Sequence, residues 1–199
     1  MRQPITLQHS FLFGAHITNA LHIVCSRCDS LNRVPRERMR QRGKCGSCYR
    51  PFYEGRSAAL HSYARFDKYA NHSDIPLLLD FWTDRCGPCR AMVPIFERAA
   101  TEPEPDVRLI NVDSDATPEL LQRFSIQSIP TLMIVHRGRE VAQIGRDAVA
   151  STSGVDREHA DALKRDRTSV DFRLITSRAI WTAIPSQTSA GSSFHRGGE

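Results

Sequence analysis

Residues 75–90, IPLLLDFWTDRCGPCR, join a short apolar run to a pair of cysteines two residues apart. The run from Ile75 to Trp82 is typical of a strand that is buried on both faces of a sheet. Apolar residues at helical spacing follow the cysteines, which predicts a helix that begins near Cys86. A C-x-x-C pair between a buried strand and a helix is typical of a redox site.

The two cysteines are expected to have different roles. Cys86 is predicted to lie at the helix N-terminus, where unpaired backbone N–H groups and the helix dipole stabilise a thiolate and lower its pKa. Cys86 is therefore the predicted attacking sulfur, and Cys89, one turn further on, would resolve the mixed disulfide. Asp80 lies inside the apolar run, so desolvation should raise its pKa and make it the candidate general base for Cys89. A structural acid with a local partner is the alternative for Asp80.

The surrounding chain alternates between helical and strand patterns. We predict an amphipathic helix over 58–73, a strand over 107–113, a helix over 118–124 and a strand over 131–135. A turn at Arg137-Gly138 and a further strand follow. This order of elements indicates an α/β fold.

The ends of the chain carry weaker signals. Residues 1–20 show no sustained period and are expected to be a disordered extension. The α/β domain is expected to run over 58–165, with an atypical segment from 145 and a weak helix over 154–165. A tail over 166–199, rich in Ser, Thr, Arg and Gly, is predicted to be disordered.

Four cysteines form a second constellation in the segment 21–57. Cys25-x-x-Cys28 is followed after 16 residues by Cys45-x-x-Cys48, a spacing that is typical of zinc sites. Four thiolates complete a tetrahedron around the metal and leave no position for water, which favours a structural zinc ion. Free thiols, two redox pairs or a nucleic-acid-binding zinc ribbon are the alternatives. The segment has too little apolar material for a core of its own, so a metal would have to organise it.

Composition excludes several classes of protein. The 199 residues have a mean hydropathy of -0.39 and no long apolar run, so we expect no membrane span. The N-terminus lacks the apolar core of a secretory signal, which makes the cytoplasm the expected location. The net charge of +5 is concentrated around the four cysteines, where it offsets the charge of a zinc–thiolate site, and the segment has few aromatic residues for base stacking. Nucleic acid is therefore disfavoured as a partner.

Two sets of motifs resemble one family. DFWTDRCGPCR at 80–90, with Pro94 and then SIPT at 128–131, closely resembles thioredoxin. VCSRCDSLNRVP at 24–35 and CGSCYRPFYEG at 45–55 resemble the zinc module of the thioredoxin-2 type. The resemblance implies a thioredoxin fold, a central mixed β-sheet flanked by helices, preceded by a small zinc-ribbon-like module.

The resemblance also implies a function. The chain is expected to be a monomer that reduces disulfides in client proteins, receives electrons from a thioredoxin-reductase-type donor, and holds one zinc ion and no organic cofactor. A cis peptide is expected before Pro130, beside the C-G-P-C site, where a substrate strand would pair with the backbone of Ile129. Further substrate contacts are expected from Trp82, Arg85, Gly87 and Pro88. A trans proline in a plain turn and an ordinary core tryptophan are the alternatives.

The sequence departs from the family pattern at three places. Arg85 replaces the usual tryptophan and is expected to lower the pKa of Cys86 further. Asn111 replaces a lysine, so Asp80 should be harder to ionise. Gly145-Arg146 and the polar segment after it replace a glycine loop and an apolar helix, which leaves a second function open: a zinc-containing, redox-sensing binding or holdase-like module.

Overall fold

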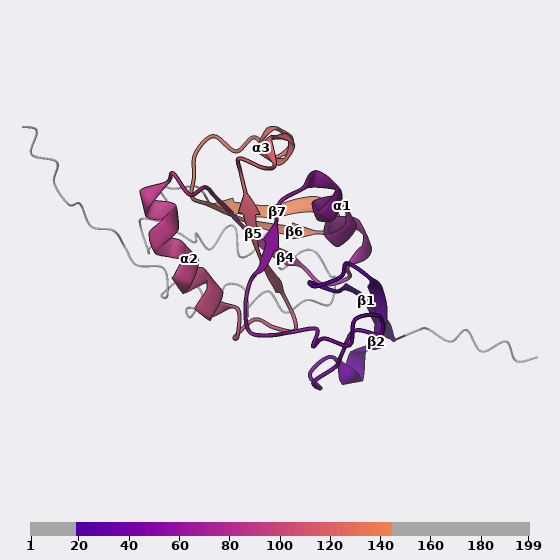
Figure 1. The fold of residues 1–199 in the computed structure, drawn as a ribbon. Coiled ribbons are helices and arrows are strands. Elements are labelled where there is room, and N and C mark those ends of the chain that lie inside the picture. The colour runs from indigo at the N-terminus through magenta and orange to yellow at the C-terminus, as the bar shows by residue number, and fades with distance from the viewer. Residues whose placement is uncertain (1–18, 145–199) are drawn as a thin grey trace, which may run out of the picture.

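The computed structural model describes residues 19–144, and these residues carry seven strands, three α-helices and one short 3-10 helix (Figure 1). In chain order the elements are β1 (Ala20–Val24), β2 (Leu31–Pro35), η1 (Arg36–Arg38), β3 (Ala58–Leu60), α1 (Tyr63–His72), β4 (Leu77–Trp82), α2 (Gly87–Ala99), β5 (Arg108–Asp113), α3 (Pro118–Arg123), β6 (Thr131–His136) and β7 (Arg139–Ile144). Ala20 already belongs to β1. Residues 1–18 of the expected extension over 1–20, the atypical segment from 145, the helix expected over 154–165 and the tail over 166–199 lie outside the described residues.

A mixed sheet of five strands forms the larger part of the molecule. Its strand order is β3-β5-β4-β6-β7, in which β3, β5 and β4 run parallel and β6 and β7 pair antiparallel. The strands β4 and β6 are buried almost throughout. Their largely apolar sequences are typical of strands that are covered on both faces. This arrangement confirms the predicted α/β fold with a mixed sheet flanked by helices.

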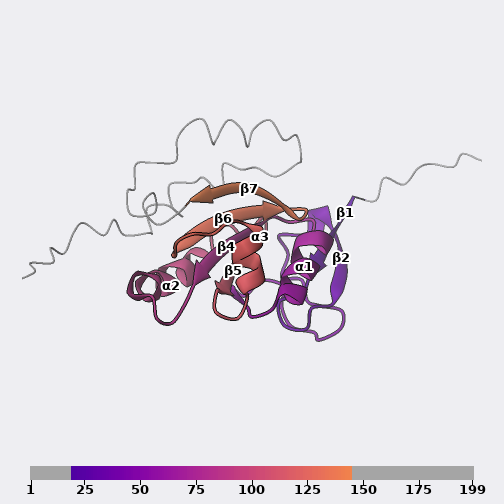
Figure 2. The ribbon, with the colours of Figure 1, turned by 90° about the horizontal axis from the view of Figure 1, so that it is seen from above.

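The helices cover the two faces of the sheet (Figures 1 and 2). Leu77, Leu79 and Phe81 of β4 pack in one cluster with buried residues of α1 and α3. Leu78, which points to the opposite face because side chains alternate along a strand, packs in another cluster with Met92 and Phe96 of α2. The helix that follows the C-x-x-C pair therefore covers the face of the sheet to which Leu78 and Asp80 point.

The helix expected over 58–73 is wrong in its first part. Ala58–Leu60 is a strand that pairs in parallel with β5, and Leu60 is buried in the core. The helix begins only at Tyr63, after Ser62, whose hydroxyl accepts a hydrogen bond from the backbone N–H of Arg65 at 3.4 Å. Such a cap satisfies a backbone N–H at the start of the helix, so the chain changes from strand to helix at this serine.

The four-cysteine segment packs directly against the sheet domain. Strands β1 and β2 form a two-stranded antiparallel sheet. The buried apolar residues of the segment, which include Ile23 and Phe52, cluster with Ile75 just before β4. The backbones of His22 and Asp74 are joined by a hydrogen bond from Asp74 N to His22 O at 2.8 Å. The small core of the segment is thus completed by a residue of the larger domain.

Candidate functional site

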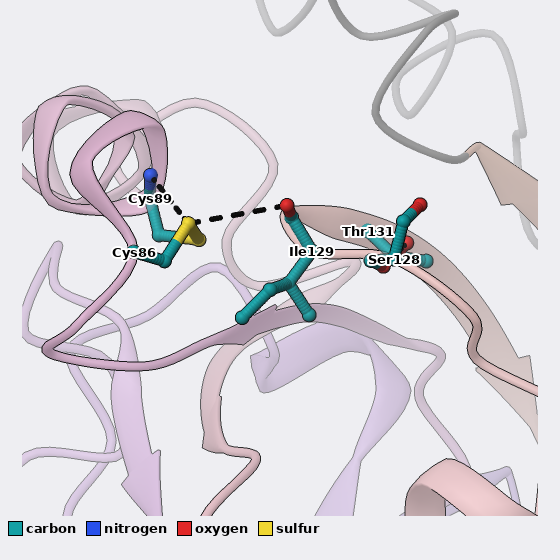
Figure 3. The surroundings of a disulfide bond; sticks show 5 residues. All are labelled: Cys86, Cys89, Ser128, Ile129 and Thr131. Atoms are coloured by element: carbon teal, nitrogen blue, oxygen red, sulfur yellow. Dashed lines mark hydrogen bonds between the residues drawn. A yellow bond between two sulfur atoms is a disulfide. The ribbon is translucent and has the colours of Figure 1, made fainter.

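The cysteine pair of the C-G-P-C motif lies at the start of α2. Cys86 is the N-cap residue, and its Sγ accepts a hydrogen bond from the backbone N–H of Cys89 at 3.2 Å (Figure 3). A disulfide joins the two residues, so the structure shows the oxidised state of the site. In the reduced state, the same backbone N–H and the helix dipole would stabilise a thiolate at Cys86. The prediction that the helix begins near Cys86 is confirmed, since α2 starts at Gly87.

The two sulfurs differ in exposure. Cys86 is half-buried, whereas Cys89 is completely buried on the face of α2 that packs on the sheet. Gly87 and Pro88, which separate them, are exposed. A substrate disulfide can therefore approach Cys86 from solvent, whereas Cys89 has no exposed surface.

Asp80 lies in the middle of β4 with no exposed surface. Neither of its carboxylate oxygens has a hydrogen-bond partner among the described residues. Burial raises the pKa of Asp80 to about 7. Asp80 lies on the same face of β4 as Leu78, which packs in one cluster with Met92 and Phe96 of α2. Cys89 lies one turn before Met92 on that helix. The sheet and the helix thus bring a buried acid and the buried cysteine into the same layer.

The loop before β6 forms the second wall of the site, because the start of β6 pairs with the end of β4. The peptide bond between Ile129 and Pro130 is cis, as expected, and the carbonyl oxygen of Ile129 lies 3.9 Å from the Sγ of Cys86 (Figure 3). Pro130 is buried and Ile129 is half-buried. Thr131 fixes the loop, because its hydroxyl donates to the carbonyl of Ser128 at 2.7 Å. The residue of this loop that lies beside Cys86 is therefore the half-buried Ile129.

The rim of the site is charged. Arg85 is exposed, and its guanidinium group forms an ion pair with Asp115 at 2.6 Å. The pairing of Arg85 with Asp115 was not predicted, because 30 residues separate the two and no local pattern links them. The carboxylate offsets part of the positive charge that Arg85 was expected to bring to Cys86. Trp82, at the end of β4, is half-buried.

The four remaining cysteines converge on one point. Their sulfur atoms all lie within 4.8 Å of one another, and the pairs Cys25–Cys48 and Cys28–Cys45 are 3.7 Å apart. A zinc ion with four bonds of about 2.3 Å requires sulfur separations of about 3.8 Å. The residues therefore fit a tetrahedral zinc ion.

Both C-x-x-C turns have the same backbone geometry. Asp29 N donates to Cys25 O and Tyr49 N donates to Cys45 O, each at 3.0 Å. Asp29 and Tyr49, the residues after the second cysteine of each turn, have φ values of 56° and 60°. Backbone N–H groups also approach the first sulfur of each turn at 3.4 Å. Two matched turns with N–H groups aimed at sulfur are suited to a negatively charged metal–thiolate centre.

Helix α1 holds the first of these turns. The hydroxyl of Tyr69 donates to the carbonyl of Cys25 at 3.1 Å, and Arg65 binds the carbonyl of Ser26 at 2.6 Å and the carboxylate of Asp29 at 2.9 Å. These roles of Tyr69 and Arg65 were not predicted, because their partners lie in another part of the chain. The sequence pattern of α1 shows only that Tyr69 is on its apolar face.

A cysteine pair that can close and reopen at the start of a helix, with one sulfur within reach of solvent, is the working part of a thiol–disulfide oxidoreductase. Within residues 19–144 the fold and the C-G-P-C site define this class of protein. Comparison with known families gives the particular family. The thioredoxin family model matches residues 57–152, and the model "Thioredoxin 2, N-terminal", a zinc ribbon, matches residues 24–49. The chain belongs to the thioredoxin family.

Individual relatives agree with this family. Thioredoxin C-3 of Corynebacterium nephridii is 36% identical over 122 residues, which cover 61% of this chain and 83% of that protein. Thioredoxin 1 of Nostoc sp. is 35% identical over 88 residues, or 44% of this chain and 82% of that protein. The putative thioredoxin 2 of Streptomyces coelicolor is 49% identical over 70 residues, or 35% of this chain and 51% of that protein. The zinc module and the oxidoreductase domain are thus both matched by known families.

None of the helices described between residues 19 and 144 is long and apolar enough to cross a membrane.

Proposed function

We propose that the chain reduces disulfide bonds in client proteins by dithiol–disulfide exchange at Cys86 and Cys89. The observation that carries this proposal is the position of Cys86: its half-buried sulfur accepts the N–H of Cys89 at the start of α2. In the reduced protein, the Cys86 thiolate attacks one sulfur of the client disulfide. A Cys86–client disulfide forms, and the other client sulfur leaves as a thiolate.

The second step releases the client. Cys89 loses its thiol proton to the Asp80 carboxylate, and the Cys89 thiolate attacks Cys86. The mixed disulfide breaks, the client leaves with its second sulfur reduced, and the disulfide between Cys86 and Cys89 forms. The client gains two electrons and the site loses two. A base whose pKa lies at about 7 suits this task, because it can both take up and release a proton near neutral pH.

The client is proposed to bind along the loop that contains Ile129. Its extended backbone would pair with that of Ile129, which is half-buried and beside Cys86, while the buried Pro130 shapes the loop. The other proposed contacts surround the sulfur: Trp82, Arg85, Gly87 and Pro88. Gly87 and Pro88 are exposed, so a client can lie across the start of α2.

The four-cysteine segment, proposed to run over 21–57, would hold one zinc ion through Cys25, Cys28, Cys45 and Cys48. Support comes from sulfur separations that match a tetrahedron of thiolates. Bound zinc would supply a structural cross-link between the two turns, and four protein ligands leave no position for a reacting water. We propose no organic cofactor for the exchange reaction, since its electrons pass between sulfurs.

Several properties of the whole protein are proposed from the family and the composition. The electron donor is a reductase of the thioredoxin-reductase type, which reopens the disulfide between Cys86 and Cys89. The protein works in the cytoplasm as a monomer whose oxidoreductase domain runs over 58–165. Six cysteines in C-x-x-C pairs suit a reducing compartment.

Insulin reduction by the full chain, with dithiothreitol as the electron source, tests this function. We expect Cys86→Ser to abolish turnover, because the attacking sulfur is lost. Cys45→Ser, which removes a proposed zinc ligand, should keep a substantial part of the activity if the metal site is structural. An intact chain that does not accelerate insulin reduction would contradict the proposal, and so would full activity in Cys86→Ser.

A further inference from the structure

A second polar side chain lies beside the buried carboxyl group of Asp80. Asn111 of β5 is the register partner of Asp80 across the parallel β4–β5 ladder, and Asn111 is only 8% exposed. Neighbouring strands are about 4.8 Å apart, and in-register residues point to the same face of the sheet. On the other side of β4, the register partner of Asp80 is the apolar Leu132. The sheet thus gives Asp80 one polar neighbour in register.

Ser57 contacts the side-chain amide of Asn111. The Nδ2 of Asn111 donates a hydrogen bond to the hydroxyl of Ser57 at 2.9 Å. Ser57 directly precedes β3, and β5 lies between β3 and β4 in the sheet. Because the nitrogen of the planar amide bonds on the β3 side, its oxygen is left available to the β4 side, where Asp80 lies. That oxygen is buried and has no hydrogen-bond partner among the described residues.

A buried amide oxygen requires a hydrogen-bond donor. The carboxyl group of Asp80 is also without a partner, and it becomes a donor only when it is protonated. We propose that Ser57 is a positioning residue: it fixes the amide of Asn111 with its oxygen toward Asp80, so that this oxygen accepts a hydrogen bond from the protonated carboxyl group, directly or through one water molecule. This inference deepens, and rests on, the proposed role of Asp80 as the base for Cys89.

The consequence is a bias toward the acid form of Asp80. An acceptor beside a carboxyl group stabilises the protonated state and not the carboxylate, so it acts in the same direction as burial, which raises the pKa of Asp80 to about 7. Cys89 of α2 is held in the disulfide, and the titratable groups on the same face of the strands beside β4 are Asp113 of β5, which lies 3.6 Å from His61, and His136 of β6. The Ser57–Asn111 hydrogen bond would therefore help to set the pH at which the base becomes a carboxylate.

The test is a titration of Asp80 in the full-length, oxidised protein. The pH dependence of its carboxyl carbon, followed by NMR, is compared in the parent, Ser57→Ala and Ser57→Thr. Loss of the hydroxyl frees the amide to turn its NH₂ group toward the carboxylate, so Ser57→Ala should lower the pKa of Asp80 by on the order of one unit. Ser57→Thr keeps a hydroxyl and should titrate like the parent.

A second variant shows whether the effect passes through Asn111. In an Asn111→Leu background no amide remains, so Ser57→Ala should no longer change the titration. An unchanged titration in Ser57→Ala would overturn the inference, as would an undiminished effect in the Asn111→Leu background. If Asn111→Leu does not fold, the comparison of Ser57→Ala with Ser57→Thr decides alone. Unchanged insulin reduction in Asp80→Asn at neutral pH would instead remove the base role of Asp80, while the carboxyl titration still tests Ser57.

Discussion

Asp80 is a buried acid whose ionisation works against the fold. Its pKa is raised from 3.8 to about 7 by burial, so the folded chain keeps a proton that the unfolded chain releases near pH 4. The free energy of unfolding should therefore fall as the pH rises from about 4 to about 7, and it should stay lowered above that range. Removing the carboxyl group should remove this dependence.

Asp80→Asn is expected to stabilise the protein at pH 8 by on the order of a few kcal/mol and to change its stability little at pH 4. Urea unfolding of the oxidised protein at the two pH values measures this difference. Asp84→Asn, at an exposed position before the cysteines, is the matched control and should show no comparable gain. An equal change at both pH values for Asp80→Asn would show that the carboxyl group does not ionise at a cost to the fold.

The ion pair at the rim is expected to change the pKa of the Cys86 thiol. Asp115 lies 2.6 Å from the guanidinium group of Arg85 and offsets part of its charge. Asp115→Asn should therefore lower the pKa of the Cys86 thiol in the reduced protein, by a few tenths of a unit because both side chains are exposed. Thiolate absorbance at about 240 nm against pH measures this shift. An unchanged thiol titration in Asp115→Asn would contradict the proposed offset.

At the scale of elements, the β6–β7 hairpin depends on two residues with left-handed backbone. Arg137 and Gly138 have φ values of 49° and 74°, which suits a two-residue turn between antiparallel strands. A Cβ at Gly138 would also clash with the side chain of Asn71. Gly138→Ala should therefore destabilise the protein by about 1–2 kcal/mol, whereas Arg137→Gly should be close to neutral. Equal urea midpoints for Gly138→Ala and the parent would contradict this account of the turn.

The sequence predicted those elements whose pattern is local. β4 and β6 were found because each is a continuous apolar run, and α2 because its apolar residues recur at helical spacing. β3 was missed, since three residues gain strand character only by pairing with β5, which lies about 50 residues further along the chain. Ser62 was the local signal that could have ended the false helix, because serine is a preferred N-cap residue.

In the candidate site, too, the residues with a local sequence pattern were predicted and the contacts between distant residues were not. All six cysteines were found from spacing, and Asp80 from its place in an apolar run, because each signal lies within a few residues. The partners of these residues depend on how distant strands and helices pack. The sequence could therefore not show that Asp115 pairs with Arg85, that Ser57 orients Asn111, or that α1 binds the first zinc turn.

At the scale of the whole molecule, the zinc module and the oxidoreductase domain share an interface. Ile75 completes the core of the module, and α1 supplies Tyr69 and Arg65 to the turn that contains Cys25. The module itself has a two-stranded sheet and few buried apolar residues. Without a metal, its burial is too small to offset the conformational entropy of about 1–2 kcal/mol for each ordered residue.

Removal of zinc from the full chain should therefore unfold the module and weaken the domain that contacts it. After treatment with a chelator under reducing conditions, amide signals of residues 20–55 should lose their dispersion in NMR spectra, while those of β4, β5 and β6 should keep it. The melting temperature should also fall, because Tyr69 and Arg65 lose their partners in the first turn. Cys86→Ser, which leaves all four zinc ligands in place, is the control and should respond to the chelator as the parent does. Dispersed signals throughout the module after complete loss of zinc would show that its packing against Ile75 and α1 is sufficient without the metal.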